Sequence, residues 1–140
     1  MTVAIGPTHD IDACLALRRR VFIEEQGVSP DEERDGRDDA AHHLLATLDG
    51  RPVGCARILI KGDTGKIGRV CVLPEHRGTG LGAALIRACL DHLRKLGGVS
   101  RAALGAQTHA LAFYENLGFT AHGPVFDDAG IPHRAMERAL

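Results

Sequence analysis

Residues 73–86, LPEHRGTGLGAALI, constrain the fold of this chain more than any other segment. They place Gly78, Gly80 and Gly82 between an apolar stretch and a run of leucines and alanines with helical spacing. Because glycine inside regular structure is destabilising, this cluster indicates a backbone that bends sharply or that another molecule approaches closely. The start of a helix attracts anions, so the expected visitor at this strand, turn and helix is a phosphate.

Length and composition predict one cytoplasmic domain. The 140 residues suffice for one buried core and are too few for two, so we expect a single domain over residues 1–140. Hydrophobic residues make up 44% and charged residues 25%, as in soluble globular proteins. No apolar run approaches the roughly 18 to 20 residues of a membrane helix, and MTVAIGPTHD lacks the basic and apolar parts of a secretory signal. We therefore expect no membrane partner.

The cysteines and histidines form no metal or disulfide pattern in the sequence. Cys14, Cys55, Cys71 and Cys89 are scattered among apolar residues without a CxxC, which favours reduced core thiols. Only two of the eight histidines are neighbours, and neither HExxH nor a helical HxxxH occurs. The sequence therefore predicts no metal site.

Charge is nearly balanced overall but unevenly distributed. The net charge of −1 argues against a general nucleic-acid binder. Residues 24–39 hold eight acids and two arginines, a local charge of −6, whereas residues 61–101 hold eight basic and three acidic residues, a local charge of +5. The glycine cluster lies in the basic part.

Hydrophobic periodicity and turn signals predict a mixed α/β chain. Asp49-Gly50 indicates a type I′ hairpin between two strands, and a third strand follows to complete an antiparallel meander. Polar residues 28–39 are expected as a loop or a short helix. The expected strands are 2–5, 42–48, 51–60, 67–73, 100–107 and 130–140, and the expected helices begin near residues 10, 80 and 109.

Two common phosphate loops fit the glycine cluster poorly. A P-loop requires GxxxxGK, and no lysine occurs between Lys66 and Lys95. Gly78, Gly80 and Ala83 formally satisfy the dinucleotide fingerprint, but no acid follows about 20 residues later to hold a ribose. Antiparallel hairpins upstream also contradict a fold that begins with parallel βαβ units.

The third arrangement, Arg77-x-x-Gly80-x-Gly82 after VCVLPEH, resembles the acetyl-CoA motif of the GNAT superfamily of N-acetyltransferases. AQTHALAFYENLGF resembles the fifth strand and fourth helix of that superfamily, and the whole chain is similar to its small bacterial ElaA-like branch. The resemblance implies a GNAT-type α/β (α+β) fold: a mixed, mostly antiparallel twisted sheet, splayed between its fourth and fifth strands and flanked by about four helices.

The resemblance also implies acetyl-CoA as co-substrate. Its pantetheine arm would pair with the backbone of Val70, Cys71 and Val72, and an amide of Cys71 or Val72 would stabilise the thioester oxygen. Arg77 would stand at the mouth of the pyrophosphate turn. His109 occupies a position where the superfamily often has Asn, so that contact is a departure from the pattern. The pyrophosphate turn itself comprises Gly78, Thr79, Gly80, Leu81, Gly82 and Ala83.

Tyr114, the only tyrosine, resembles the superfamily residue that donates a proton to the departing thiolate of coenzyme A. No motif fixes the base that activates the amine. Residues Phe22, Glu25, His43 and His133 are expected near the acceptor. The candidates for the base are Glu24, Glu25, His42, His43, Glu75 and His133.

The sequence therefore predicts an acetyl-CoA-dependent N-acetyltransferase that acts directly on a primary amine of a small molecule or peptide. The acidic stretch 24–39 is expected to border the acceptor and favour a cationic amine. Two alternatives remain open: a non-catalytic acyl-CoA-binding or regulatory domain, and an acetyltransferase for amino-sugar phosphates. A homodimer is possible because many relatives dimerise.

Overall fold

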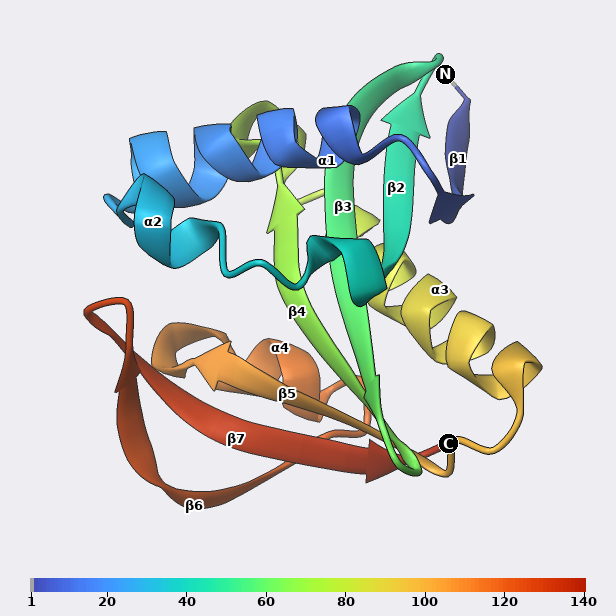
Figure 1. Cartoon of the computed structure of the whole chain (residues 1–140), viewed down its shortest axis with the longest axis vertical. Helices are drawn as coiled ribbons and strands as arrows, with labels where there is room; N and C mark the ends of the chain where they lie inside the picture. Colours follow the sequence, from blue (N-terminus) through green and yellow to red (C-terminus); the bar gives the residue numbers. More distant parts are fainter. Residues whose placement is uncertain (1) are drawn as a thin grey trace.

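The computed structural model describes residues 2–140 and contains a seven-stranded sheet in the order β1-β2-β3-β4-β5-β7-β6 (Figure 1). The strands are β1 (Val3–Thr8), β2 (His42–Leu48), β3 (Arg51–Lys61), β4 (Thr64–Val72), β5 (Arg101–Gln107), β6 (Thr120–Asp128) and β7 (Ile131–Ala139). The α-helices are α1 (Ile11–Arg18), α2 (Pro30–Glu33), α3 (Leu81–Leu96) and α4 (Leu111–Glu115).

The first four strands are antiparallel, and the expected meander of β2, β3 and β4 is confirmed. Asp49 and Gly50 join β2 to β3 with φ angles of 50° and 80°. Both values lie in the left-handed region, as a type I′ turn requires. Strand β1 is longer than predicted and pairs with β2 along its whole length.

Each face of the sheet buries its own hydrophobic core. Strand residues alternate between the two faces, so Leu44 and Ala46 pack beneath α3 whereas Leu45 packs on the side of α1. Leu85, Ile86, Cys89 and Leu93 form the buried stripe of α3. The smaller core beneath α1 includes Cys14, Leu17, Val21, Cys55 and Cys71.

The helices begin and end at recognisable signals. Asp10 caps α1 by accepting a hydrogen bond from the Ala13 amide, and the chain continues without a break into the π-helical turns Arg19–Glu25. Ser29 caps the short α2, which realises the expected short helix in residues 28–39. Within residues 2–140, no helix combines the length and apolar character needed to cross a membrane.

Strand β6 was not predicted from the sequence. Gly123 and Pro124 interrupt it and are typical of a turn, but β6 lies at the edge of the sheet, where a missing N–H is tolerated. The register against β7 shifts between His122 and Phe126, and Arg134 Nε donates to the Gly123 carbonyl oxygen across this irregularity. Tertiary pairing with β7 therefore overrides the local turn signal.

Strands β4 and β5 run parallel but pair over only three residues, Thr64 to Lys66 against Arg101 to Ala103. Beyond this point β5 pairs only with β7, and the two strands diverge from a shared end near the C-terminus (Figure 1). The predicted fold class, a mostly antiparallel sheet splayed between its fourth and fifth strands, is confirmed.

The contact between β4 and α3 predicts a stability difference between two glycines of one strand. A Cβ at Gly65 would collide with the fully buried Leu93 side chain, whereas a Cβ at Gly68 meets no atom within 4 Å. We expect Gly65→Ala to lower the free energy of unfolding by about 1–3 kcal/mol. Gly68→Ala, the matched control, should change it by less than about 0.5 kcal/mol. Urea denaturation of both variants measures this, and equal stabilities would contradict the packing argument.

Candidate active site

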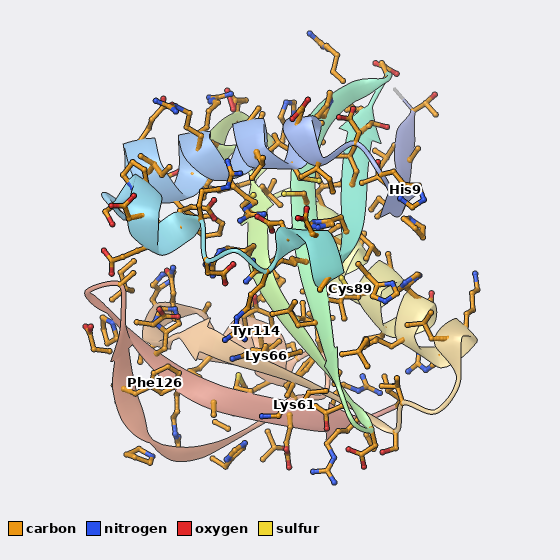
Figure 2. The ribbon with its side chains drawn as sticks, viewed as in Figure 1. His9, Lys61, Lys66, Cys89, Tyr114 and Phe126 are labelled. Carbon is orange, nitrogen blue, oxygen red and sulfur yellow. The ribbon has the colours of Figure 1, made fainter. Side chains whose placement is uncertain are left out.

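The separation of β4 from β5 opens a cleft of about 980 Å³. In Figure 2, Lys66 and Tyr114 lie near the centre of the view, where β4 and β5 diverge, and Phe126 lies on β6. All three line the cleft. Of the residues predicted from the sequence, the cleft is lined by Phe22, Glu25, Val70, Cys71, Val72, Arg77, His109, Tyr114 and His133.

The glycine turn next to this cleft presents a row of free amides. Within the described chain, the N–H groups of residues 78–83 donate no hydrogen bond, and the first helical bond runs from the Ala84 amide to the Gly80 carbonyl oxygen. Thr79 Oγ1 donates to the His76 carbonyl oxygen at 2.9 Å and fixes the turn. Such a row at the start of a 16-residue helix is an arrangement that binds anions.

The three glycines of the turn differ in what requires them. Gly78 and Gly80 have φ angles of 77° and 83°, so the backbone needs glycine there with or without a ligand. At Gly82 the φ angle is ordinary, and an added Cβ would lie 3.5 Å from the Phe113 ring, a normal contact. The protein itself would therefore accept a side chain at position 82, and glycine is required there only if a ligand packs closely against the backbone.

The Arg77 side chain is engaged within the protein. Its Nη1 and Nη2 atoms each lie 2.7 Å from a carboxylate oxygen of Glu25, and its Nε donates to the Val72 carbonyl oxygen at 3.0 Å. The hydrogen bonds from Arg77 lower the pKa of Glu25. Arg77 thus ties the end of the π-helical turns to the end of β4 and does not reach freely into the pyrophosphate turn.

Strand β4 carries a bulge inside the cleft. Arg69 and Val70 lie opposite the single residue Ala56 of β3, and Arg69 has a left-handed φ of 50°. Further along, the Leu73 amide donates to the Val53 carbonyl oxygen. Because backbone groups alternate sides along an antiparallel strand, the N–H and C=O of Val72 point away from β3 towards the open side.

Tyr114 reaches the cleft from α4. Its ring packs edge-on against Phe113 and Phe119, with centroids 4.9 and 6.0 Å away, and against the core beneath α3. Burial, with a smaller contribution from Cys89, raises the pKa of Tyr114 to about 12. The phenol is therefore protonated throughout the neutral and mildly basic range.

A chain of polar side chains crosses the end of the cleft. Gln107 Nε2 donates to Gln26 Oε1 at 3.0 Å, and His109 Nε2 donates to Gln107 Oε1 at 2.7 Å. Of these three residues, only His109 was predicted from the sequence. A glutamine at the last position of a buried strand was the available signal for Gln107, whereas nothing local marks Gln26.

The structure separates the candidate bases into two groups. Only Glu25 and His133 line the cleft. His43 is buried on β2, where Nε2 donates to the Asp38 carbonyl oxygen, and His42 contacts His92 of α3, so neither lies with the other predicted acceptor residues. The two remaining candidate bases also lie outside the cleft: Glu24 faces Arg19, and Glu75 pairs with Arg20.

Most of the acidic stretch is neutralised by arginines. Glu33 accepts from Arg18 and Arg69 at 2.9 and 3.0 Å, and Asp35 accepts two hydrogen bonds from Arg57 at 2.9 and 2.8 Å. Asp38 completes this arginine–carboxylate cluster with contacts of 2.7 Å to Arg18 and 3.2 Å to Arg57. The acids border the cleft, but their charge is largely balanced, which weakens the predicted attraction of a cationic amine.

The cysteines are less scattered in space than along the sequence. All four are free thiols and buried, and Cys55 Sγ lies 3.5 Å from Cys71 Sγ on the neighbouring strand. Within residues 2–140, no group of three or more His, Cys, Asp or Glu side chains is arranged to hold a metal ion.

A family model described as an acetyltransferase (GNAT) domain matches residues 15–140. The chain belongs to the GNAT acetyltransferase family. YjcF of Bacillus subtilis, named an uncharacterized N-acetyltransferase, is 38% identical over 121 residues, which cover 86% of both chains. The crystal structure of Escherichia coli ElaA is 31% identical with a TM-score of 0.86 and covers 98% of this chain and 99% of its own.

The crystal structure of an acyl-CoA N-acyltransferase from Pseudomonas aeruginosa is also similar, with 33% identity, a TM-score of 0.85 and coverage of 99% of both chains. The predicted resemblance to the GNAT superfamily and to ElaA is therefore confirmed. Family membership supports an acyl- or acetyltransferase.

The arginine–carboxylate cluster predicts loss of stability in acid. The Arg57 guanidinium holds the pKa of Asp35 well below its usual range, and at Asp38 the arginines outweigh the opposite effect of burial and lower the pKa. Lowered pKa values contribute stability that is complete above the unfolded value of about 3.9 and is lost as the pH falls below it. We expect Asp35→Asn to cost about 1–3 kcal/mol at pH 7 and progressively less towards pH 3.

Thermal unfolding between pH 7 and pH 3 measures this effect. Asp39→Asn is the matched control, because Asp39 is an exposed neighbour with no ion pair among the described residues. A stability difference between wild type and Asp35→Asn that stays constant with pH would contradict the assignment.

Proposed function

We propose that this protein transfers an acetyl group from acetyl-CoA directly to a primary amine. The observation that carries the proposal is the pairing of two features: a row of free amides at the start of α3 and the adjoining cleft between β4 and β5. The first suits a pyrophosphate and the second suits an extended chain that ends in a thioester.

The residues present fit acetyl-CoA. In the proposed arrangement the amides of residues 78–83 receive the pyrophosphate, and the open edge of β4 receives the pantetheine arm as an added strand. The Val72 N–H is the group we assign to the thioester oxygen, because the alternation of the ladder turns the Cys71 amide towards β3. Arg77 would position the end of β4 through its hydrogen bonds to the Val72 carbonyl oxygen and to Glu25 and would not bind the pyrophosphate directly.

The proposed chemistry requires no covalent enzyme intermediate. Cys71 lines the cleft, but its thiol is buried beside Cys55 beneath α1. Tyr114 approaches from the opposite side, and its protonated hydroxyl would stabilise the departing thiolate by a hydrogen bond and supply a proton. Its raised pKa makes this phenol a weaker acid than a free tyrosine, so the hydrogen bond is the larger expected contribution.

Two cations favour a second class of acceptor. Arg37 and Lys66 line the cleft without an ion pair within the described chain, as do the carboxylates Glu32 and Asp128, so charges of both signs are available to an acceptor. Together with the balanced arginine–carboxylate cluster, the two cations suit an amine that also carries a carboxylate or phosphate. The amino-sugar phosphates and acidic amino acids are therefore acceptor candidates beside simple cationic amines.

The function is tested by thermal shift with acetyl-CoA, followed by release of free thiol with butylamine, spermidine, lysine, glutamate and glucosamine 6-phosphate. Stabilisation by acetyl-CoA together with amine-dependent thiol release supports the enzyme. Stabilisation without thiol release for any amine favours a non-catalytic acyl-CoA-binding domain, and the absence of both refutes the proposal.

Gly82 provides a direct test of the pyrophosphate turn. We expect Gly82→Ala and Gly82→Val to weaken acetyl-CoA binding in that order, with Val costing more than about tenfold, or about 1.4 kcal/mol. The fold should tolerate the change because the added Cβ meets Phe113 at an ordinary distance. Arg87→Val, at an exposed position of the same helix, is the control. Unchanged affinity of Gly82→Val in calorimetry would contradict the assignment.

Tyr114→Phe tests the leaving-group role. The substitution removes only the hydroxyl, so we expect kcat to fall by about 10- to 100-fold while the affinity for acetyl-CoA stays nearly constant. Because the pKa of Tyr114 is raised to about 12, ionisation of this residue should not limit the wild-type rate below pH 10. Stopped-flow thiol release and calorimetry give the two quantities, and an unchanged kcat would exclude Tyr114 from the mechanism.

A further inference from the structure

We propose that His133 is the general base that accepts a proton from the acceptor amine, an assignment that rests on the proposed acetyltransferase function. A primary alkylamine has a pKa of about 10.4 and is almost fully protonated at pH 7, so a base within the cleft would raise the fraction able to attack. Of the six candidate bases named from the sequence, Glu25 and His133 line the cleft of the described chain, together with His109 and the carboxylates Glu32, Glu33, Asp35 and Asp128.

Glu25 is a poor candidate for this role. Both of its carboxylate oxygens lie 2.7 Å from Arg77, and this pairing lowers its pKa. A carboxylate so stabilised gains little by accepting a proton. Glu33 and Asp35 are likewise bound to arginines, and Glu32 and Asp128 are exposed to solvent, so His133 is the candidate that remains.

The surroundings of His133 fix its tautomer and its orientation. Nδ1 lies 2.7 Å from the Ile131 carbonyl oxygen, which can only accept, so Nδ1 carries the hydrogen. The lone pair of the neutral imidazole is then on Nε2. The Phe126 ring stacks on His133 with a centroid distance of 5.8 Å and an interplanar angle of 25°.

Nε2 is available to a ligand. It has no hydrogen-bond partner within residues 2–140, yet it is not among the buried polar atoms that lack a partner, so it retains contact with solvent. His133 as a whole is only 9% exposed and lines the cleft. The ring is thus held rigidly with one free nitrogen, which is the geometry that a general base requires.

His133 and Tyr114 approach the cleft from opposite faces of the sheet. Met136 of β7 is buried in the core beneath α3, where Tyr114 also packs. His133 is three residues from Met136 on the same strand, so alternation places it on the other face. In the proposed mechanism, Tyr114 donates a proton to the thiolate from one face of the sheet, and His133 accepts a proton from the amine on the other face.

The proton balance is complete without a further reactant. Nε2 of His133 takes one proton from the ammonium group, directly or through one water, and the free amine forms the N–C bond to the thioester carbon. The S–C bond breaks, and the thiolate takes the proton of Tyr114. The second proton of the nitrogen returns to Tyr114 through solvent, and His133 releases its proton to water, so that one proton is produced for each acetyl group transferred.

Charged groups from several elements line the cleft around His133. The carboxylates are Glu25, Glu32, Glu33, Asp35 and Asp128, and the cations are Arg37, Arg57, Lys66, Arg69 and Arg77. The neighbouring strand β5 contributes the uncharged Gln107, which pairs with His133 in the ladder. His109 also lines the cleft, but its Nε2 is bound to Gln107, and its ring is exposed.

The test compares two substitutions with matched effects on structure. His133→Asn retains a donor for the Ile131 carbonyl oxygen and removes Nε2, whereas His133→Gln retains a polar group near Nε2 without its basicity. With butylamine as the acceptor, we expect both variants to lose about 100-fold or more in kcat/KM at pH 7. The loss should shrink as the pH approaches the amine pKa of about 10.4, because solution then supplies the neutral amine.

Three controls separate this role from a structural one. His122→Gln, an exposed histidine of β6 outside the cleft, should keep the wild-type rate. Acetyl-CoA affinity should stay within about twofold in every variant, and imidazole should restore part of the activity of His133→Ala. A folded His133→Asn variant with a near wild-type rate or an unchanged pH profile overturns the base assignment alone. A wild-type protein that acetylates none of the five amines overturns the proposed function and this assignment with it.

Discussion

The short ladder between β4 and β5 is the constraint on which the site depends. Three paired residues hold the strands together at one end, and beyond them both strands have backbone groups without a neighbour between them. Unpaired edges within a sheet are normally unfavourable. Here β5 is still supported by seven pairs with β7, and the Val72 carbonyl accepts a hydrogen bond from Arg77. The opening is thus stabilised from its sides, and the groups left over form the surface available to a ligand.

The arginine–carboxylate cluster anchors the bulge of β4, which borders this opening, to the side of α1. It joins α1, the segment 33–38, β3 and the bulge of β4 through Arg18, Arg57 and Arg69. The left-handed backbone at Arg69 costs about 1–3 kcal/mol by itself. Its guanidinium is fixed by the Glu33 side chain and by backbone carbonyl oxygens, which makes the bulge compatible with a stable fold. The buried charges of this cluster therefore contribute more to positioning β4 at the wall of the cleft than to the overall stability of the fold.

Local signals explain which parts of the molecule the sequence could predict. The turn at Gly78 and Gly80 and the hairpin at Asp49-Gly50 require left-handed backbone, which few residues supply, so their composition is readable without tertiary contacts. Strand β6 exists only through pairing with β7, and the arginine–carboxylate cluster depends on residues from four separated segments. The negative charge of residues 24–39 could be counted in the sequence, but its neutralisation by arginines from other segments could not be predicted.

The two faces of the split sheet favour the proposed direct transfer. In the proposed arrangement the thioester lies along β4 with Tyr114 on the side of α3, and the amine enters beside His133 on the opposite side. An acyl-cysteine route would need a nucleophilic thiol between them. Cys71 is the cleft-lining cysteine, but it is 4% exposed, its sulfur faces Cys55, and both belong to the apolar core beneath α1. A sulfur packed in an apolar core is poorly placed to attack a thioester, whereas in the proposed arrangement the opening through the sheet lets the amine reach the thioester carbon without an intermediary.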